Sequence, residues 1–206
     1  MKTQPKIDLY KLHKSEYAAP RKPVLLETKP AQYLAIEGQG APGGQVFTAA
    51  IGALYATAFT IKMTRKFAGH RDYAVCKLEG LWWSTPAVDF AKLPPAKWRW
   101  KLLIRTPDFI AKTDLRQAVA TLLKRGKAPE VKRVRLEQLK EGPCVQLLHV
   151  GPYDQVRVSI ASMRQFANDR KLDFAGRHHE IYLSDPRRVP PERLRTILRQ
   201  PLRRSK

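Results

Sequence analysis

The sequence has few cysteines, few acidic residues and no long hydrophobic run. Cys76 and Cys144 are its only cysteines, which is too few for a disulfide framework, and their spacing is not that of a metal site. The longest apolar stretch, residues 46–61, is interrupted by threonines and is shorter than the roughly 20 apolar residues of a membrane helix. The first residues lack the apolar segment of a signal peptide. We therefore expect a reduced, cytoplasmic protein with no membrane partner.

The shortage of acidic residues leaves a net charge of +21, from 39 Lys and Arg against 18 Asp and Glu. The excess is spread along the chain, although residues 187–206 hold eight basic residues and one acidic residue. No helix-turn-helix, zinc-finger or aromatic RNA-binding pattern accompanies it. The charge therefore favours a solvated basic surface over specific nucleic-acid recognition, and leaves non-specific nucleic-acid contact open.

The chain has 206 residues, of which 43% are hydrophobic, enough for one sizeable domain or two small modules with a shared core. Its patterns predict two similar series of elements. The first is a hairpin of strands at 24–28 and 33–38, a glycine-rich turn, a helix over 45–62, and strands at 73–83 and 98–105. The second is strands at 131–139 and 144–150, a turn at Gly151, a helix over 154–170 and a strand at 178–185. A helix over 113–125 separates the two series, and Pro190-Pro191 predicts a last helix with Leu194, Ile197 and Leu198 inward.

The two series lie roughly 100 to 110 residues apart, which indicates an internal duplication. An offset of 101 pairs Glu79 with Glu180, whereas alignment of the two Ser-x-Pro ends requires an offset of 100. We predict an α+β fold with an arm over 1–22 and one domain over 23–206. That domain comprises a first module (23–110), a linking helix (113–126) and a second module (130–206).

Glu180 is the main candidate for chemistry. Strand alternation puts it on one face with Tyr182, where a carboxylate beside an aromatic ring suits a flat or cationic organic molecule. Glu180 either contacts such a ligand or activates water, or it pairs with His178, His149 or an arginine in a structural network. Glu79 is open to the same two interpretations. Tyr153, after the Gly151 turn, either caps the next helix or donates its hydroxyl to a ligand.

All four tryptophans fall within 19 residues, at Trp82, Trp83, Trp98 and Trp100. They either fill a core or form an aromatic wall against a planar molecule, and Trp83 shares a strand face with Glu79. Candidate ligand-binding residues are therefore Trp82, Trp83, Trp100, Tyr182, His149 and Tyr33. Adjacent histidines in a strand point apart, so His178 and His179 do not form a metal set, and we expect no metal or cofactor.

Several motifs resemble the GyrI-like small-molecule-binding family. They are His149-Val150-Gly151-Pro152-Tyr153, Lys77-Leu78-Glu79-Gly80-Leu81-Trp82-Trp83, Trp98-Arg99-Trp100, and His178 to Pro186. The resemblance covers residues 23–202. It implies two strand-helix-strand-strand modules with antiparallel sheets, related by a pseudo-twofold, with a ligand cleft between them. It places the key pocket carboxylate of the family at Glu180, with Glu79 as its first-module counterpart.

The resemblance is to the stand-alone type, because nothing before residue 23 is long enough for a DNA-binding domain. It implies binding of planar or cationic cytotoxic molecules by a monomer or weak dimer, and hydrolysis of a cyclopropanoid DNA alkylator. Glu180 or Glu79 would be the base, and a tyrosine such as Tyr153 would donate to the developing oxyanion. The alternatives are a non-catalytic drug sink or sensor, and a protective protein associated with gyrase or DNA.

Overall fold

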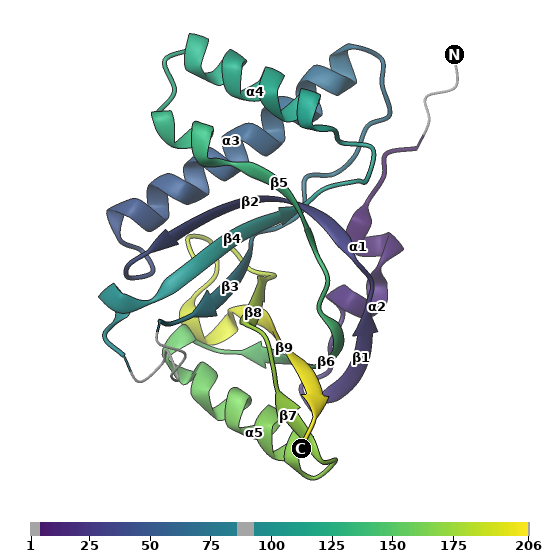
Figure 1. The fold of residues 1–206 in the computed structure, drawn as a ribbon, viewed down its shortest axis with the longest axis vertical. Coiled ribbons are helices and arrows are strands. Elements are labelled where there is room, and N and C mark those ends of the chain that lie inside the picture. The colour runs from purple at the N-terminus through teal and green to yellow at the C-terminus, as the bar shows by residue number, and fades with distance from the viewer. Residues whose placement is uncertain (1–4, 86–92, 206) are drawn as a thin grey trace. The chain divides into compact units, whose positions relative to one another are not determined.

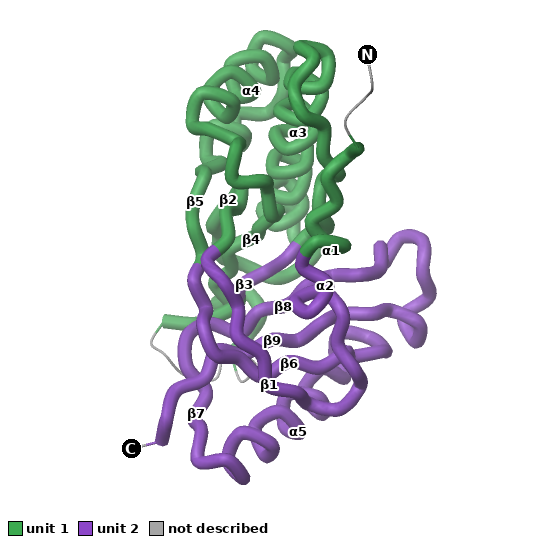
Figure 2. The backbone as a smooth tube through the Cα atoms, turned by 90° about the vertical axis from the view of Figure 1, so that its right-hand side faces the viewer, with its two compact units in different colours: residues 1–12, 31–78, 82–139 green, residues 13–30, 79–81, 140–206 purple. Residues whose placement is uncertain are grey.

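The computed structural model describes residues 5–85 and 93–205, and the chain forms two compact units. Unit 1 contains residues 1–12, 31–78 and 82–139, and unit 2 contains residues 13–30, 79–81 and 140–206 (Figure 2). Each is a mixed unit in which helices pack on an antiparallel sheet. Strand β3 (Glu79–Trp83) contributes its first three residues to unit 2 and its last two to unit 1.

Unit 1 is built on a long central strand with a helix across it. The strand β2 (Ala31–Gln39) pairs antiparallel with β4 (Arg99–Arg105) on one side and β5 (Arg135–Leu139) on the other. Helix α3 (Gln45–Phe67) packs on β2 and β4, and α4 (Lys112–Lys124) packs on α3 (Figure 1). The 3-10 turns η2 (Pro95–Lys97) and η3 (Pro129–Arg133) precede β4 and β5.

The core of unit 1 explains these positions, because even-numbered strand residues face the helix. The main members of this core are Leu34, Ile36, Leu102, Ile104, Ala50, Leu54 and Ile61. Helix α3 is long and apolar enough to cross a membrane by length and composition, the one such helix in the described part of the chain. Since its buried residues pack in this cluster, it serves as a core helix.

Unit 2 has the same plan with more strands. Its sheet runs β1 (Val24–Thr28), β6 (Gly142–Val150), β9 (Arg195–Arg204), β8 (His178–Tyr182), then β3, and β7 (Leu172–Phe174) pairs with the end of β9. Helix α5 (Val156–Asn168) covers one face and buries Met163 and Ala167 against Val145, Leu147 and Leu198. Two 3-10 turns, η4 (Tyr153–Gln155) and η5 (Pro191–Arg193), start α5 and precede β9.

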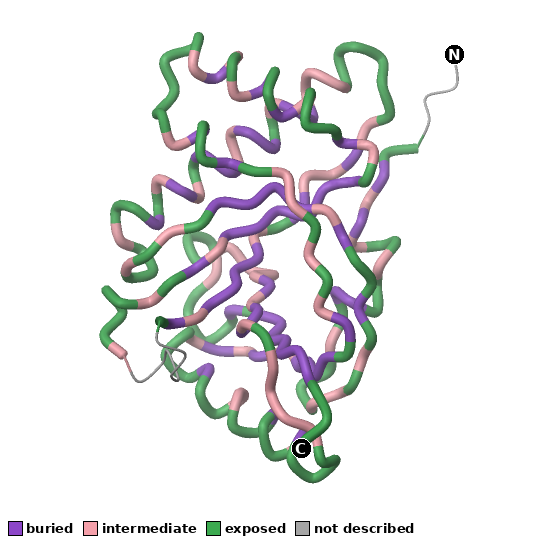
Figure 3. The backbone as a smooth tube through the Cα atoms, viewed as in Figure 1, coloured by how far each residue is buried: buried purple, intermediate pink, exposed green. Residues whose placement is uncertain are grey.

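The N-terminal arm is divided between the units. Ile7 bridges to Tyr73 in unit 1, and Leu9, in α1 (Leu9–Leu12), is buried there. The next short helix, α2 (Lys14–Tyr17), belongs to unit 2, where Glu16 and Tyr17 are buried. Burial along the chain is shown in Figure 3.

Two secondary-structure predictions were wrong. The last helix is the strand β9, whose residues 196–202 are all buried. β9 lies between two other strands and is covered on both faces, so its sequence does not alternate between polar and apolar residues. Its apolar residues therefore resemble the buried face of a helix. The strand expected from residue 73 begins at Glu79, and residues before it are irregular apart from the Tyr73 bridge.

The predicted hairpins were also wrong, because the first strand of each series pairs with the other series. Strand β1 pairs with β6, with Leu26 opposite Cys144, and β5 pairs with β2, with Leu136 opposite Leu34. Polar alternation predicts which face of a strand is buried but not which strand lies beside it. The sequence pattern therefore could not show this exchange.

Candidate functional site

Glu180 lies on one face of β8 with His178 and Tyr182, as the two-residue period of the strand requires. Its side chain is 14% exposed, and its carboxylate is 3.4 Å from Nε2 of His178. Tyr182 contacts Tyr153 edge to face, with ring centroids 6.0 Å apart. A carboxylate, an imidazole and two phenols thus gather in unit 2, with the carboxylate only partly removed from solvent.

The His149–Tyr153 motif explains how Tyr153 reaches this face. The chain turns at Gly151, whose φ of +142° favours glycine. The His149 ring fixes the turn: Nε2 donates to the Pro152 carbonyl (3.2 Å), and Nδ1 accepts from the Ser159 hydroxyl (2.9 Å). Because both ring nitrogens are used, His149 acts on the site through the turn that carries Tyr153.

The register across the sheet connects this turn to the site. His149 is opposite Thr196 on β9, and Thr196 is opposite Tyr182 on β8, so the three side chains share a face. Burial, followed by the negative charges of Glu180 and Asp185, raises the pKa of Tyr153 to about 12. Its hydroxyl therefore stays protonated and able to donate a hydrogen bond, although the residue is 41% exposed.

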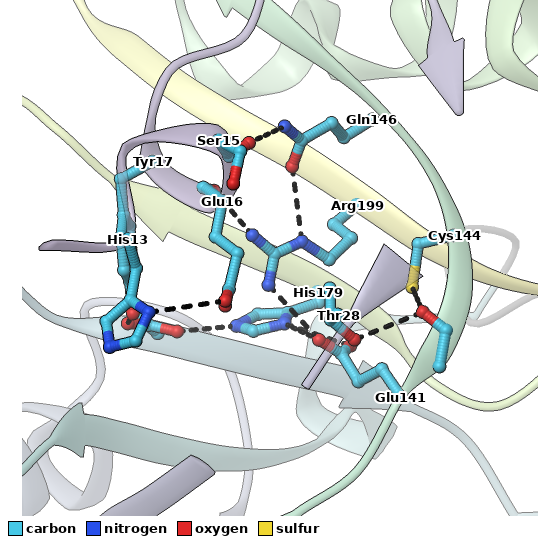
Figure 4. Close-up of polar contacts among 12 residues, drawn as sticks. His13, Ser15, Glu16, Tyr17, Thr28, Glu141, Cys144, Gln146, His179 and Arg199 are labelled. Atoms are coloured by element: carbon cyan, nitrogen blue, oxygen red, sulfur yellow. Dashed lines mark hydrogen bonds and ion pairs between the residues drawn. The ribbon is translucent and has the colours of Figure 1, made fainter. Parts of the chain in front are cut away.

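The opposite face of β8 holds a buried chain of charged groups, shown in Figure 4. The Tyr17 hydroxyl donates to Glu79 (2.9 Å), whose other oxygen is 3.0 Å from Nε2 of His179. Nδ1 of His179 is 3.0 Å from Glu141, which also accepts from Arg199 (3.2 Å). The side chains of Glu79 and His179 are completely buried. We call these five residues, with Gln146, the buried network.

The electrostatics of the network keep it charged. Burial disfavours the imidazolium, but Glu141 and then Glu79 outweigh it and raise the pKa of His179 to about 9. Burial also disfavours the Glu141 carboxylate, but His179 and Arg199 lower its pKa to about 2. At neutral pH His179 is therefore a cation between two glutamates.

The network also attaches the start of the chain to unit 2. Arg199 donates through Nη2 to the Glu16 carbonyl (2.6 Å) and through Nε to Gln146 (3.3 Å), while the Gln146 amide donates to the Ser15 carbonyl (3.1 Å). These bonds satisfy a buried guanidinium and hold α2 against the sheet. Residues 13–17 are thus an integrated part of the unit.

The aromatic candidates of unit 1 are mainly packed side chains. Trp82 stacks on Phe47 at 5.7 Å, and Trp100 contacts Phe47 edge to face at 5.2 Å. Trp100 is fully buried over Gly38, where a Cβ would come within 2.2 Å of the ring, and Tyr33 is 2% exposed. Trp83 is half-buried, so among these side chains it is the most accessible to a ligand.

The structure therefore brings together four of the predicted site residues in unit 2: Glu180, Tyr182, Tyr153 and His149. It places Glu79 in the buried network, Trp82 and Trp100 in the core of unit 1, and Tyr33 buried on the other face of β2. Tyr17, Glu141 and Arg199 did not stand out in the sequence, since neither their spacing nor a motif connects them. Glu141 lies between the strands predicted at 131–139 and 144–150.

The fold thus repeats a strand-helix-strand-strand arrangement and carries a half-buried carboxylate beside aromatic rings in unit 2. The family model for the GyrI-like small molecule binding domain matches residues 21–203, and the chain belongs to this family. The family match confirms the resemblance that the sequence motifs indicated. No curated protein matches the chain.

Several solved structures are similar over nearly the whole chain. An uncharacterized conserved protein from Listeria innocua is 37% identical, with a TM-score of 0.90 over 96% of this chain and 100% of its own. A hydrolase encoded by lin2189 from the same organism is also 37% identical, with a TM-score of 0.88 over 97% and 100% of the two chains. The EcmrR C-terminal domain, at 10% identity and a TM-score of 0.58 over 89% and 98%, shares the fold.

Proposed function

We propose that this protein binds planar, hydrophobic cytotoxic molecules at the Glu180 face of unit 2 and opens their cyclopropane ring with water. The observation that carries the proposal is the position of the half-buried Glu180 carboxylate beside Tyr182 and Tyr153. The similarity to a Listeria innocua hydrolase at 37% identity favours a hydrolytic reaction over binding alone. The product of such a reaction would no longer alkylate DNA, which gives a protective role in the cytoplasm.

In the proposed step, the Glu180 carboxylate accepts a proton from water as the water oxygen bonds to a cyclopropane carbon. The strained carbon–carbon bond breaks, and its electron pair passes through the conjugated system to a carbonyl oxygen. That oxygen becomes an oxyanion and takes a proton from the Tyr153 hydroxyl, which Glu180 restores directly or through water. The net change is the addition of one water molecule, and both side chains return to their starting state.

The aromatic rings would bind the planar part of the substrate. Tyr182 is held edge to face by Tyr153, so it offers an oriented ring at low entropic cost, and an offset contact contributes about 0.5–1.5 kcal/mol beyond burial. Trp83 shares a strand face with Glu79, and Glu79 bonds His179 on the face of β8 opposite Glu180, so Trp83 is not part of this proposed contact. For a cationic ligand, Glu180 would supply the opposite charge.

Incubation of the pure protein with a cyclopropanoid alkylator, followed by mass spectrometry, tests the proposal. We expect a product with one added water, and a loss of turnover of about 10²–10⁴-fold in Glu180→Gln, the typical contribution of a general base. The exposed Glu192→Gln is the matched control and should retain turnover. Because Glu79 is in the buried network, Glu79→Gln should lower stability while the folded fraction still turns over the substrate.

The second candidate is a non-catalytic sink or sensor, which the aromatic contacts of Tyr182 and Tyr153 would equally support. In that case the alkylator would be recovered unchanged from a saturable complex, and Glu180→Gln would weaken cationic ligands more than neutral ones of the same shape. Unchanged drug with no saturable binding would contradict both functions.

A further inference from the structure

The outward side of α4 and the segment after it carry a dense set of cations in unit 1. Eight basic residues of 112–135 are exposed, and we call them the basic patch: Lys112, Arg116, Lys124, Arg125, Lys127, Lys132, Arg133 and Arg135. The acidic residues of the same segment are Asp114 and Glu130, and neither is exposed. The segment is labelled at α4 in Figure 1, and the exposed turns of that helix are seen in Figure 3.

Four carboxylates of unit 1 pair with cations outside the basic patch. Asp72 binds Lys62 at 2.8 Å, Asp114 binds Arg65 at 3.0 Å, and Glu37 and Glu137 both bind Lys101. These three cations are half-buried or buried. These four carboxylates thus neutralise inward cations and form no ion pair with the basic patch.

The basic patch itself forms no ion pair with a carboxylate within the described residues. Two of its members bind the backbone: Arg133 donates to the Glu37 carbonyl, and Arg135 donates to the Lys132 and Val134 carbonyls. Uncompensated like charges repel one another and destabilise the folded state. An anionic partner would remove this cost.

The position of α4 in the fold points the same way. The repeated series β2-α3-β3-β4 and β6-α5-β8-β9 are complete without it. Leu115, Ala118 and Leu122 pack its inner face on α3, so the outer face is free to carry other groups. From Lys112 to Lys124 the helix extends about 18 Å, a length that suits a row of anions better than one compact anion.

We propose that the basic patch binds the phosphate backbone of a nucleic-acid duplex without reading its sequence. Lysine and arginine contact phosphates as charges or bidentate donors, and such binding depends on charge density alone. A helix that binds a membrane surface would present large apolar side chains to it. Within the described residues, the exposed large apolar side chains all lie outside the segment 112–135 that carries the patch. This proposal does not rest on the proposed small-molecule function.

Two matched variants test the location. One changes four patch lysines to glutamine: Lys112, Lys124, Lys127 and Lys132. The control changes four exposed lysines of unit 2 to glutamine: Lys14, Lys22, Lys29 and Lys140. Both lose the same charge, and circular dichroism melts establish that both fold. Fluorescence anisotropy with labelled DNA and RNA duplexes, titrated between low and moderate salt, gives the affinities.

We expect the wild type to bind both duplexes regardless of sequence. Each lost phosphate contact should reduce the slope of log K against log salt by about 0.9, so the patch variant should lose about 3 to 4 units of slope and at least about tenfold in affinity. The control should stay within about twofold at the same salt, because phosphate contacts act locally within a Debye length. A preference for RNA or DNA would identify the source of the phosphates.

Three results would overturn the proposal. The first is an equal loss of duplex affinity in both variants, which would indicate an effect of overall charge, and the second is no duplex binding by the wild type at low salt. The third is tighter binding to poly-glutamate or to phosphatidylglycerol vesicles than to duplexes. The last would assign the patch to an acidic polypeptide or a membrane. Turnover or binding of the small molecule should be unchanged in the patch variant, which separates the two proposals.

Discussion

Two adjacent residues of β8 illustrate how one strand serves two purposes. His179 faces the buried network, with Glu79 and Glu141 each 3.0 Å from one of its nitrogens. Glu180 faces the other way, beside Tyr182 and near His178. The network fixes the backbone of β8 from one side, and this fixed backbone carries the candidate carboxylate on the other. Precision at Glu180 is therefore a consequence of bonds made by its neighbour.

Replacement of Glu141 by glutamine should be strongly destabilising. Glu141 is the carboxylate partner of both Arg199 and His179, so its loss leaves the Arg199 guanidinium without a carboxylate partner in a buried site. Breaking a buried pair in this way costs about 3–5 kcal/mol of unfolding free energy. Urea denaturation would measure it, with the exposed Glu192→Gln as control. A change below about 1 kcal/mol would show that water enters the network.

The network should also give stability a defined pH dependence. The pKa of His179 is raised from 6.5 to about 9, so its contribution is complete below pH 6.5 and is lost as the pH rises through 9. The pKa of Glu141 is lowered from 4.5 to about 2, so its contribution is complete above pH 4.5 and is lost as the pH falls toward 2. Both contributions are therefore complete between pH 4.5 and 6.5.

Urea unfolding at a series of pH values would check this. The wild type should lose stability between pH 6.5 and 9, and His179→Gln should be less stable overall but show a flatter profile in that range. Parallel profiles for the two proteins would mean that His179 does not titrate as the structure requires. Comparison of the two proteins removes the contribution of the many lysines, which titrate in both.

At the scale of helices and strands, the internal duplication is a better guide to secondary structure than local hydrophobic patterns. The helices α3, α4 and α5 and the strands β6 and β8 were predictable, because their hydrophobic periodicity and the turns that bound them are clear in the sequence. The strand β9 was misread as a helix from its apolar residues, yet its counterpart in the repeat, β4, reads clearly as a strand through Trp100, Leu102 and Ile104. Consistent use of the repeat would have predicted β9.

The partners of the strands and the members of the buried network could not be predicted from the sequence, for a different reason. The exchange of β1 and β5 depends on long-range pairing, such as Leu26 with Cys144, that leaves no local signal. Tyr17 and Glu141 are unremarkable in sequence, and no sequence pattern connects them to Glu79 and His179, which they meet only in the fold. The face that Glu180 shares with Tyr182 could be predicted, because strand alternation is local to a single strand.

Two glycines on successive elements make a matched test of packing in unit 1. Gly38 on β2 lies against Trp100, and a Cβ there would come within 2.2 Å of the ring, whereas Gly52 on α3 faces open space. Gly38→Ala should destabilise by about 1–3 kcal/mol through overpacking. Gly52→Ala should stabilise by about 0.5–1 kcal/mol through helix propensity. Thermal melts of both variants would decide, and equal effects would contradict the close approach of β2 to Trp100.

At the scale of the whole molecule, the charge of +21 is the dominant electrostatic feature. Some carboxylates pair with inward cations, such as Asp72 with Lys62 and Glu141 with Arg199, and the large excess of basic residues leaves the surface cationic. Like charges at the surface repel one another and lower the free energy of unfolding. Added salt shortens the screening length to about 10 Å at 0.1 M and so weakens this repulsion.

The melting temperature should therefore rise with sodium chloride from low to moderate concentration. If screening recovers about 1 kcal/mol, the increase for a chain of this size is about 2–4 °C. The variant with four patch lysines changed to glutamine should start higher and rise less, because part of the repulsion is already gone. A melting temperature that falls with salt would mean that attractive surface pairs outweigh repulsion. In that case the basic patch would impose no folding cost for a polyanion to relieve, and the reason to expect such a partner would weaken.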